Sequence, residues 1–333
     1  MLTIYTSTPW PMGESSEEPL RYLDDVIVWT EELGCDGMLI FADNTSFDPW
    51  MIAGRVLEKS HGLVPLIAAN PVYQHPVSVA KSINSIAAGR GRRVALNLVT
   101  GGFSRHLREI GCDLDHGQRY DRLAEFGAII AELTSAERPM KYLGEYYRLD
   151  GLRPSPPPVA GLEPHLFVSG VSEDCIRVQK KLGATRLSYP REPSEYAEGS
   201  ISADIGFRLG IIAREDANAA WRLAYERFPV DLFGEDVHDL AARSVESHWH
   251  RQLSEDALEE SAPIGNYWMY PFRAYKTFCP YVVGDYAETM AYLLRYMQLG
   301  ASTFILDEGS KDDLFHSVQV LRMAWSKFTS NGS

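Results

Sequence analysis

RVALNLVTGGFSRHLREIGCDLDHGQRY, residues 93–120, decides the fold class because it joins a strand end, a polar loop and a helix start. The apolar run Val94–Val99 is typical of a buried strand, and Thr100-Gly101-Gly102 marks where the chain leaves it. A polar, glycine-containing loop follows, and Asp115-His116 begins a long amphipathic helix. In an α/β barrel the loops that follow strands form the catalytic face, so this stretch predicts part of such a face.

The alternation of strand and helix extends over the whole chain. Short apolar runs predict eight strands at Leu2–Tyr5, Gly37–Phe41, Leu63–Ala69, Val94–Val99, His165–Ser169, Ala184–Tyr189, Ile205–Ala213 and Thr303–Leu306. Apolar residues at helical spacing predict helices at Pro19–Leu33, 49–60, Pro76–Ala88, Asp115–Leu133, Ser172–Leu182, Asp216–Phe228, Tyr286–Leu299 and Asp312–Phe328. This pattern predicts an α/β fold, a TIM (β/α)8 barrel with insertions.

Two segments interrupt the alternation. Residues 142–158 predict a small extended excursion that ends in a stiff proline run. Residues 231–280 lack clear periodicity and are rich in His, Trp, Tyr and Phe, which indicates an inserted, lid-like segment. We therefore expect a single barrel domain over residues 1–333. An open, doubly wound sheet is the alternative, but no G-x-G-x-x-G follows the first strand, which disfavours its dinucleotide-binding form.

Composition and charge exclude several classes of protein. The net charge of −13 argues against binding to nucleic acid or to an anionic membrane surface. No apolar run is long enough for a membrane span, and the N-terminus does not resemble a secretory signal. The four cysteines lie far apart without a C-x-x-C, and His248 and His250 would not face each other on a helix. We expect a cytoplasmic enzyme without a metal site.

Polar residues stand where several strands end, and each of them has two interpretations. Ser169–Ser172 offers backbone N–H groups and a hydroxyl at a helix start, which suits a phosphate, or Ser172 simply caps that helix. Asn97 either contacts a ligand or closes the next loop. His116 and Tyr120 share one helical face, as ligand-binding or as capping and packing residues. Arg208, if it points inward, needs an anionic ligand or an internal carboxylate partner.

An ordered set of motifs resembles a known family. The motifs follow one another in the order found in the bacterial luciferase-like flavin monooxygenases. They are ADNTSFDPW after the second strand, NLVTGG and LDHGQRY, PHLFVSGVSED at the fifth strand, GFRLGIIARED at the seventh and VVGDYAETMAYLLRYMQLGASTFIL near the end. The chain most resembles their alkanesulfonate monooxygenase branch. The likeness covers nearly the whole chain and is weakest at residues 231–275.

The resemblance implies a TIM barrel that binds reduced FMN, supplied by a separate NAD(P)H-dependent flavin reductase. It further implies that O2 adds to the flavin and that a flavin 4a-(hydro)peroxide oxygenates a small-molecule substrate. By position, the cofactor-binding residues are Asn97 and Thr100 at the ring and ribityl chain, Ala42 and Asp43 at the flavin edge, and Tyr120, His116, Ser169, Gly170, Val171 and Ser172 at the phosphate.

The substrate side departs from that branch. The branch's loop cysteine is Ser46 here, the histidine after its arginine is Gly210, its tryptophan after strand six is Tyr189, and its late tyrosine aligns with Gly309. Arg208 is kept. Because two of these positions lose side-chain volume, we expect a substrate that is bulkier or less anionic than an alkanesulfonate.

The roles on the substrate side follow from the resemblance and from these departures. Arg208 and Tyr189 are the expected catalytic residues, and Arg208 would steer the peroxide or anchor a substrate anion. Trp10, Ser46, Arg273 and Lys276 are candidate substrate contacts. The catalytic acid or base cannot be carried over, because the corresponding cysteine, histidine and tyrosine are replaced.

The sequence thus predicts a cytoplasmic, two-component, FMNH2-dependent monooxygenase that uses O2 to oxygenate a small organic substrate, such as a biosynthetic intermediate. Members of this family commonly form homodimers or homotetramers, which we expect here. The alternatives are an alkanesulfonate-type desulfonating enzyme, a deazaflavin-dependent oxidoreductase on the same fold, and a flavin-binding accessory subunit. The spacing from Asn97 to Tyr120 favours FMN over deazaflavin, and the phosphate loop together with Arg208 argues against the accessory role.

Overall fold

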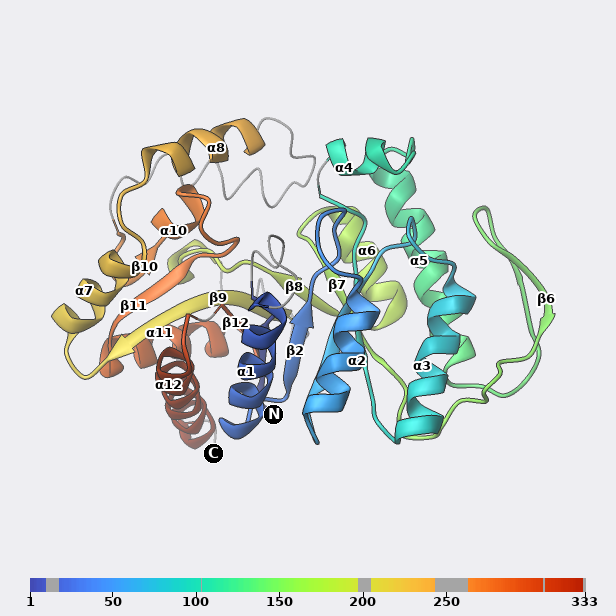
Figure 1. Cartoon of the computed structure of the whole chain (residues 1–333), viewed down its shortest axis with the longest axis horizontal. Coiled ribbons are helices and arrows are strands. Elements are labelled where there is room, and N and C mark those ends of the chain that lie inside the picture. Colours follow the sequence, from blue (N-terminus) through green and yellow to red (C-terminus); the bar gives the residue numbers. More distant parts are fainter. Residues whose placement is uncertain (10–17, 103, 197–204, 243–262, 308, 332–333) are drawn as a thin grey trace. The chain divides into compact units, whose positions relative to one another are not determined.

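The computed structural model describes residues 1–9, 18–102, 104–196, 205–242, 263–307 and 309–331 (Figure 1). Contacts divide the chain into two compact units, residues 1–38 with 187–333, and residues 39–186. The first is called the terminal unit, because it holds both chain ends, and the second the central unit. The boundaries fall inside strands β2 (Gly37–Ile40) and β8 (Thr185–Ser188).

The terminal unit is built on strands in the order β10-β11-β9-β12-β1. Strands β1 (Thr3–Ser7), β12 (Thr303–Leu306), β9 (Ile205–Arg214) and β11 (Tyr281–Asp285) pair in parallel, and β10 (Tyr267–Trp268) adds a short antiparallel edge. Strand β9 is buried at every residue except Arg214. Such continuous burial is typical of a parallel strand whose two faces are both covered.

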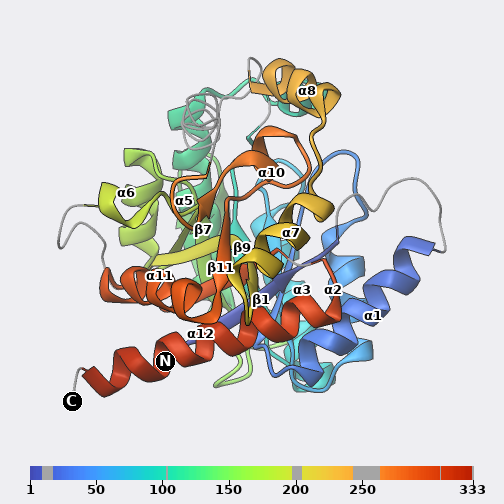
Figure 2. The same ribbon diagram turned by 90° about the vertical axis from the view of Figure 1, so that its left-hand side faces the viewer.

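The sheet of the terminal unit is accompanied by helices. They are α1 (Glu18–Glu32), α7 (Ala217–Arg227), α8 (Leu232–Ala242), α10 (Tyr270–Arg273), α11 (Tyr286–Gln298) and α12 (Lys311–Asn331), with a 3-10 turn, η1, at Pro193–Glu195. Helix α12 packs against α11, β9 and α1, and α7 packs against β9 and β11. Figure 2 shows α11 and α12 side by side.

The central unit repeats the same local arrangement. Strands β3 (Val64–Ala69), β4 (Ala95–Leu98) and β7 (His165–Ser169) pair in parallel in that order. Helices α2 (Pro49–Lys59), α3 (Pro76–Arg90), α5 (His116–Leu133) and α6 (Glu173–Leu182) accompany them, and α5 packs between α3 and α6. The unit also holds α4 (Ser104–Glu109) and an antiparallel hairpin of β5 (Met140–Leu143) and β6 (Arg148–Leu152).

All eight strands predicted from the sequence are present, as β1, β2, β3, β4, β7, β8, β9 and β12, and the predicted helices alternate with them. The fold is therefore the expected TIM (β/α)8 barrel. The hairpin β5–β6 lies at the predicted excursion. Helix α4 was not predicted, because Ser104–Glu109 contains one apolar residue, the buried Leu107, and so shows no helical periodicity. Strands β10 and β11 were not predicted, because β10 has only two residues and β11 directly follows residues 231–280, which show no clear periodicity.

Part of the predicted lid packs in the core of the terminal unit. Trp268, Met269 and Phe272 are buried in that core. Helix α8 is held to the same region by an ion pair between Arg273 Nη2 and Glu235 Oε2 at 2.8 Å. Residues 243–262, including His248 and His250, lie outside the described residues, so the lid stays a prediction. Within the described part, no helix is long and apolar enough to cross a membrane.

Helix α5 begins with a complete capping box. The Asp115 carboxylate accepts a hydrogen bond from Gln118 N at 2.9 Å, and the Gln118 side chain accepts one from Asp115 N at 3.0 Å. The two bonds satisfy backbone groups that a helix end leaves without partners. They also fix the start of the helix that carries His116 and Tyr120.

Removing this cap should destabilise the protein locally. We expect Asp115→Ala to lower the free energy of unfolding by about 1 kcal/mol, the usual cost of losing an N-cap. The exposed Asp113 precedes the cap and serves as the matched control, because Asp113→Ala changes the charge equally. Chemical denaturation of both variants measures the difference, and equal losses in the two would contradict the capping role.

Candidate active site

Two neighbouring strand ends meet in the central unit. Asn97 on β4 is buried, and its Oδ1 accepts a hydrogen bond of 2.7 Å from Ser169 Oγ at the end of β7. This bond links adjacent parallel strands at their carboxyl ends, where barrel enzymes place their sites. The structure thus brings together two residues that the sequence predicted separately for the cofactor.

The loop after β7 lies directly on α5. Gly170 has φ +138°, and a Cβ there would lie 2.8 Å from the Tyr120 hydroxyl and 3.2 Å from Cys175 Sγ. Only glycine both adopts this conformation without strain and allows such a close approach. The Tyr120 hydroxyl donates to Ser169 O at 3.3 Å, and the side chains of Ser172 and Thr100 act to lower its pKa.

Ser172 serves two neighbours at the start of α6. Its Oγ accepts a hydrogen bond from Cys175 N at 3.3 Å. Ser172 therefore caps the helix, which was the simpler of the two roles considered for it from the sequence. The same Oγ lies 3.3 Å from His116 Nε2, and the rings of His116 and Tyr120 are 5.0 Å apart. His116, Tyr120, Ser172 and the Gly170 backbone therefore form one cluster, called the loop cluster below.

Two further residues, Arg186 and Cys175, belong to the loop cluster and were not predicted from the sequence. Arg186 on β8 donates from Nη1 to Gly170 O at 3.4 Å and brings the cluster a positive charge. Cys175 is buried against Tyr120, and its burial raises the pKa of the thiol to about 11, although Arg186 opposes this. Burial likewise raises the pKa of Tyr120. Both groups are protonated at neutral pH, so the cluster offers an anion neutral donors and one guanidinium.

The loop after β2 is organised by its own side chains. Asp43 Oδ1 accepts hydrogen bonds from Thr45 N at 2.7 Å and Ser46 N at 2.8 Å, so this carboxylate shapes the loop that contains Ala42 and Ser46. Asn44 Nδ2 donates to Glu109 Oε2 at 2.9 Å and to His106 O at 3.1 Å, which ties the loop to α4.

The terminal unit contains a cavity of about 140 Å³ at the ends of β1 and β12 and beside Arg208 within β9. Its charged lining residues are Arg208, Arg227, Lys276 and Asp307. The lining also includes the hydroxyl groups of Ser7, Thr8, Tyr22, Thr277, Tyr281 and Ser310. A cavity with convergent polar groups at the carboxyl ends of barrel strands is the place where a substrate is expected.

Arg208 has an internal carboxylate partner in this cavity. Arg208 Nη2 lies 3.4 Å from Asp307 Oδ1, and the Arg208 side chain is 9% exposed. Asp307 Oδ2 accepts hydrogen bonds from Thr277 Oγ1 and, at 3.1 Å, from Tyr281. Burial alone would raise the pKa of Asp307, but Arg208, Thr277 and Arg227 outweigh it and lower that pKa. Asp307 is therefore ionised at neutral pH.

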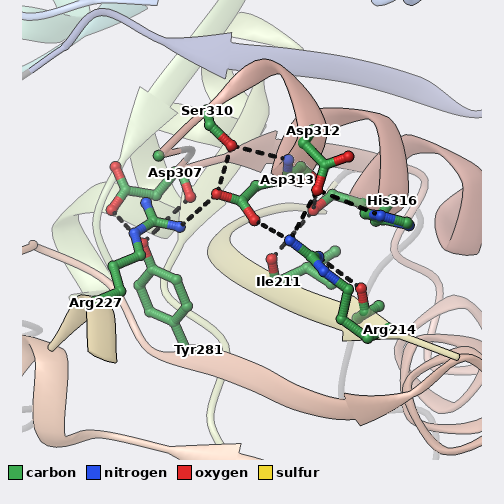
Figure 3. Close-up of polar contacts among 12 residues, drawn as sticks. Ile211, Arg214, Arg227, Tyr281, Asp307, Ser310, Asp312, Asp313 and His316 are labelled. Carbon is green, nitrogen blue, oxygen red and sulfur yellow. Dashed lines mark hydrogen bonds and ion pairs between the residues drawn. The ribbon is translucent and has the colours of Figure 1, made fainter. Parts of the chain in front are cut away.

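The charges continue outward from Asp307 in alternating order (Figure 3). Arg227 lowers the pKa of Asp307 and lies 3.7 Å from Asp313 Oδ2. Asp313 also pairs with Arg214 at 2.6 Å, and Arg214 pairs with Asp312 at 3.1 Å. This alternating series of Arg208, Asp307, Arg227, Asp313, Arg214 and Asp312 holds three cationic and three anionic side chains, so its formal charges cancel.

Two glycines that depart from the alkanesulfonate branch do not open space. A Cβ on Gly210 would lie 2.2 Å from the Tyr281 ring, and a Cβ on Gly309 would lie 2.4 Å from the Arg227 guanidinium. Those groups fill the volume that the missing side chains leave. Contrary to our expectation, the two glycines therefore do not make room for a bulkier substrate.

The other residues predicted for the substrate side are Tyr189, Arg273, Lys276 and Trp10. Tyr189 follows β8 directly and is buried, which raises the pKa of its hydroxyl, while nearby Arg208 partly offsets that effect. Arg273 pairs with Glu235, and Lys276, which lines the cavity, pairs with Asp231. Trp10 lies outside the described residues. Among those that are described, no group of His, Cys, Asp or Glu is arranged to hold a metal ion.

The close contact at Gly210 yields a test of the packing. Gly210→Ala should lower the free energy of unfolding by about 1–3 kcal/mol, the cost of overpacking against the fully buried Tyr281. Gly54 in helix α2 has open space around its missing Cβ, so Gly54→Ala should instead stabilise by about 0.5–1 kcal/mol. Denaturant unfolding measures both, and a gain in stability from Gly210→Ala would contradict this geometry.

Comparison with known proteins identifies the family. A family model described as luciferase-like monooxygenase matches residues 1–303. The chain belongs to the luciferase-like monooxygenase family. The 4-(gamma-L-glutamylamino)butanoyl-[BtrI acyl-carrier protein] monooxygenase BtrO of Niallia circulans is 31% identical over 300 residues, which are 87% of each protein. The chain is thus a monooxygenase, and its likeness to the alkanesulfonate branch in particular stays a prediction.

Solved structures share the fold of this monooxygenase. The oxygenating constituent of 3,6-diketocamphane monooxygenase of Pseudomonas putida, solved in complex with FMN, superposes with a TM-score of 0.67 at 14% identity, covering 96% of each chain. An F420-dependent secondary alcohol dehydrogenase superposes with a TM-score of 0.64 at 13% identity, covering 97% of this chain and 99% of its own. Both likenesses show the fold alone.

Proposed function

We propose that this monooxygenase binds FMNH2, delivered by an NAD(P)H-dependent flavin reductase, and uses O2 to oxygenate a small organic substrate. The loop cluster is the observation that carries the proposal. It joins a glycine backbone, two hydroxyls, an imidazole and the Arg186 guanidinium within one unit. Neutral donors beside one cation at a helix start match the hydrogen-bonding needs of a phosphate ester.

The residues present fit the cofactor at the phosphate end. A Cβ on Gly170 would reach the Tyr120 hydroxyl, so the missing side chain leaves the loop backbone close to these donors. Asn97 on β4 and Thr100 shortly after that strand would meet the ring and ribityl chain. When bound, FMNH2 supplies the two electrons with which O2 gives one oxygen atom to the substrate and the other to water.

The terminal unit supplies the groups proposed for the substrate. Arg208, which lines the cavity, and the buried Tyr189 beside it would act on the substrate, and their burial would exclude water from the reacting atoms. The relative from N. circulans acts on an acyl group carried by an acyl-carrier protein. An acyl thioester of this kind has no free carboxylate at its carbonyl carbon, and such substrates belong in any screen of this enzyme.

The phosphate assignment can be tested with two flavins that differ only in the phosphate. In anaerobic titrations, Arg186→Met should weaken the binding of FMNH2 about tenfold and leave that of reduced riboflavin nearly unchanged, because one charge-assisted contact is lost. The control Arg177→Met removes an exposed guanidinium from α6 that pairs with Asp121 and Asp174, and it should change neither affinity.

The same titration decides between cofactors. We expect saturable binding of FMNH2 by the unaltered enzyme, and an oxygen-dependent change in the flavin absorbance after aeration. The absence of FMNH2 binding would contradict the proposal. Tighter binding of a deazaflavin than of FMNH2 would instead favour the deazaflavin-dependent oxidoreductase. If Arg186→Met lost affinity for FMNH2 and for reduced riboflavin equally, the phosphate would not be bound at the loop cluster.

A further inference from the structure

We propose that Asp307 is a built-in counter-ion of Arg208 that determines specificity: it makes the cavity of the terminal unit select uncharged substrate groups and reject anionic ones. This inference rests on the proposed function only in taking the cavity as the place of the substrate. The class of group that it names includes amides, thioesters, ketones and alcohols.

The geometry around Asp307 shows that both of its oxygens are engaged. Oδ1 lies 3.4 Å from Arg208 Nη2 and 3.4 Å from Ser7 Oγ. Oδ2 accepts from Thr277 Oγ1 and Tyr281. These groups come from β1, β9, β11 and the segment before β11, so the carboxylate is held from several elements at once. It is therefore a fixed charge beside Arg208 rather than a mobile base.

Every cation that lines the cavity has a carboxylate within ion-pair distance. Arg208 has Asp307 at 3.4 Å, Arg227 has Asp313 at 3.7 Å, and Lys276 has Asp231. The lining therefore presents no uncompensated positive charge among its described residues. This differs from a site built to bind a sulfonate, which would leave at least one guanidinium or ammonium for the ligand.

An anionic group that entered this cavity would meet two costs. It would lose its hydration, and it would lie beside the ionised Asp307, with which it would compete for Arg208. An uncharged polar group avoids the second cost, because the hydroxyl-bearing Thr8 and Tyr22 also line the cavity, and the Tyr22 hydroxyl, which donates to Gly309 O at 3.1 Å, can still accept a hydrogen bond. Discrimination then arises from repulsion of the wrong ligand as much as from attraction of the right one.

The test compares an anionic and an uncharged probe that each contain eight carbon atoms. Binding of 1-octanesulfonate and of octanamide is measured by calorimetry on the full-length protein at pH 7, without flavin. The unaltered protein should bind octanamide more tightly than octanesulfonate. Asp307→Asn keeps the size of the side chain and removes its charge, so the affinity for octanesulfonate should rise at least about tenfold while that for octanamide changes little.

Control variants distinguish the loss of the Asp307 charge from a general change in net charge and from unfolding. Asp25→Asn changes the net charge equally on the exposed face of α1 and should alter neither affinity. If Asp307→Asn does not fold, judged by circular dichroism, the preference of the unaltered protein still decides the matter, and Asp307→Ser provides a second uncharged variant. Tighter binding of octanesulfonate by the unaltered protein, or no gain in the folded uncharged variant, would overturn the inference. Because no flavin is present, failure of the FMN proposal is a separate result.

Discussion

A buried guanidinium on a central strand constrains the whole terminal unit. Arg208 is placed inside the barrel by the alternation of β9, and a charge at that depth is costly unless a carboxylate lies beside it. Asp307 meets this need directly after β12, the parallel neighbour of β9. The register of two strands, Ile305 opposite Arg208, therefore brings both partners of the ion pair to the same end of the sheet.

The position of Asp307 determines how the residues around it pack. Its second oxygen holds the Tyr281 hydroxyl, and the Tyr281 ring then fills the volume beside Gly210. The Arg227 guanidinium lies 5.5 Å from the centre of that ring and fills the space beside Gly309. A single buried charge pair thus explains why two positions that carry side chains in the alkanesulfonate branch carry none here.

The sequence predicted what depends on local signals and missed what depends on contacts between distant segments. The eight strands, the capped start of α5 and the Ser169–Ser172 loop follow from periodicity, capping residues and glycine placement, and each is visible within a short window. Arg186 and Tyr281 gave no such signal, because their importance arises from neighbours far away in the chain. Arg208 was singled out, but its partner could not be chosen among 45 acidic residues.

The protonation states of Arg208 and Asp307 in the cavity, and of Tyr189 beside Arg208, limit what these side chains can contribute to the reaction. Burial raises the pKa of Tyr189, and Tyr189 and Asp307 raise that of Arg208 against the effect of its own burial. The pKa of Asp307 is lowered, so all three groups keep one protonation state across neutral pH. A general acid or base works best with a pKa near the working pH. These three residues are therefore suited to orienting the substrate and excluding water, and the oxygen chemistry falls to the cofactor.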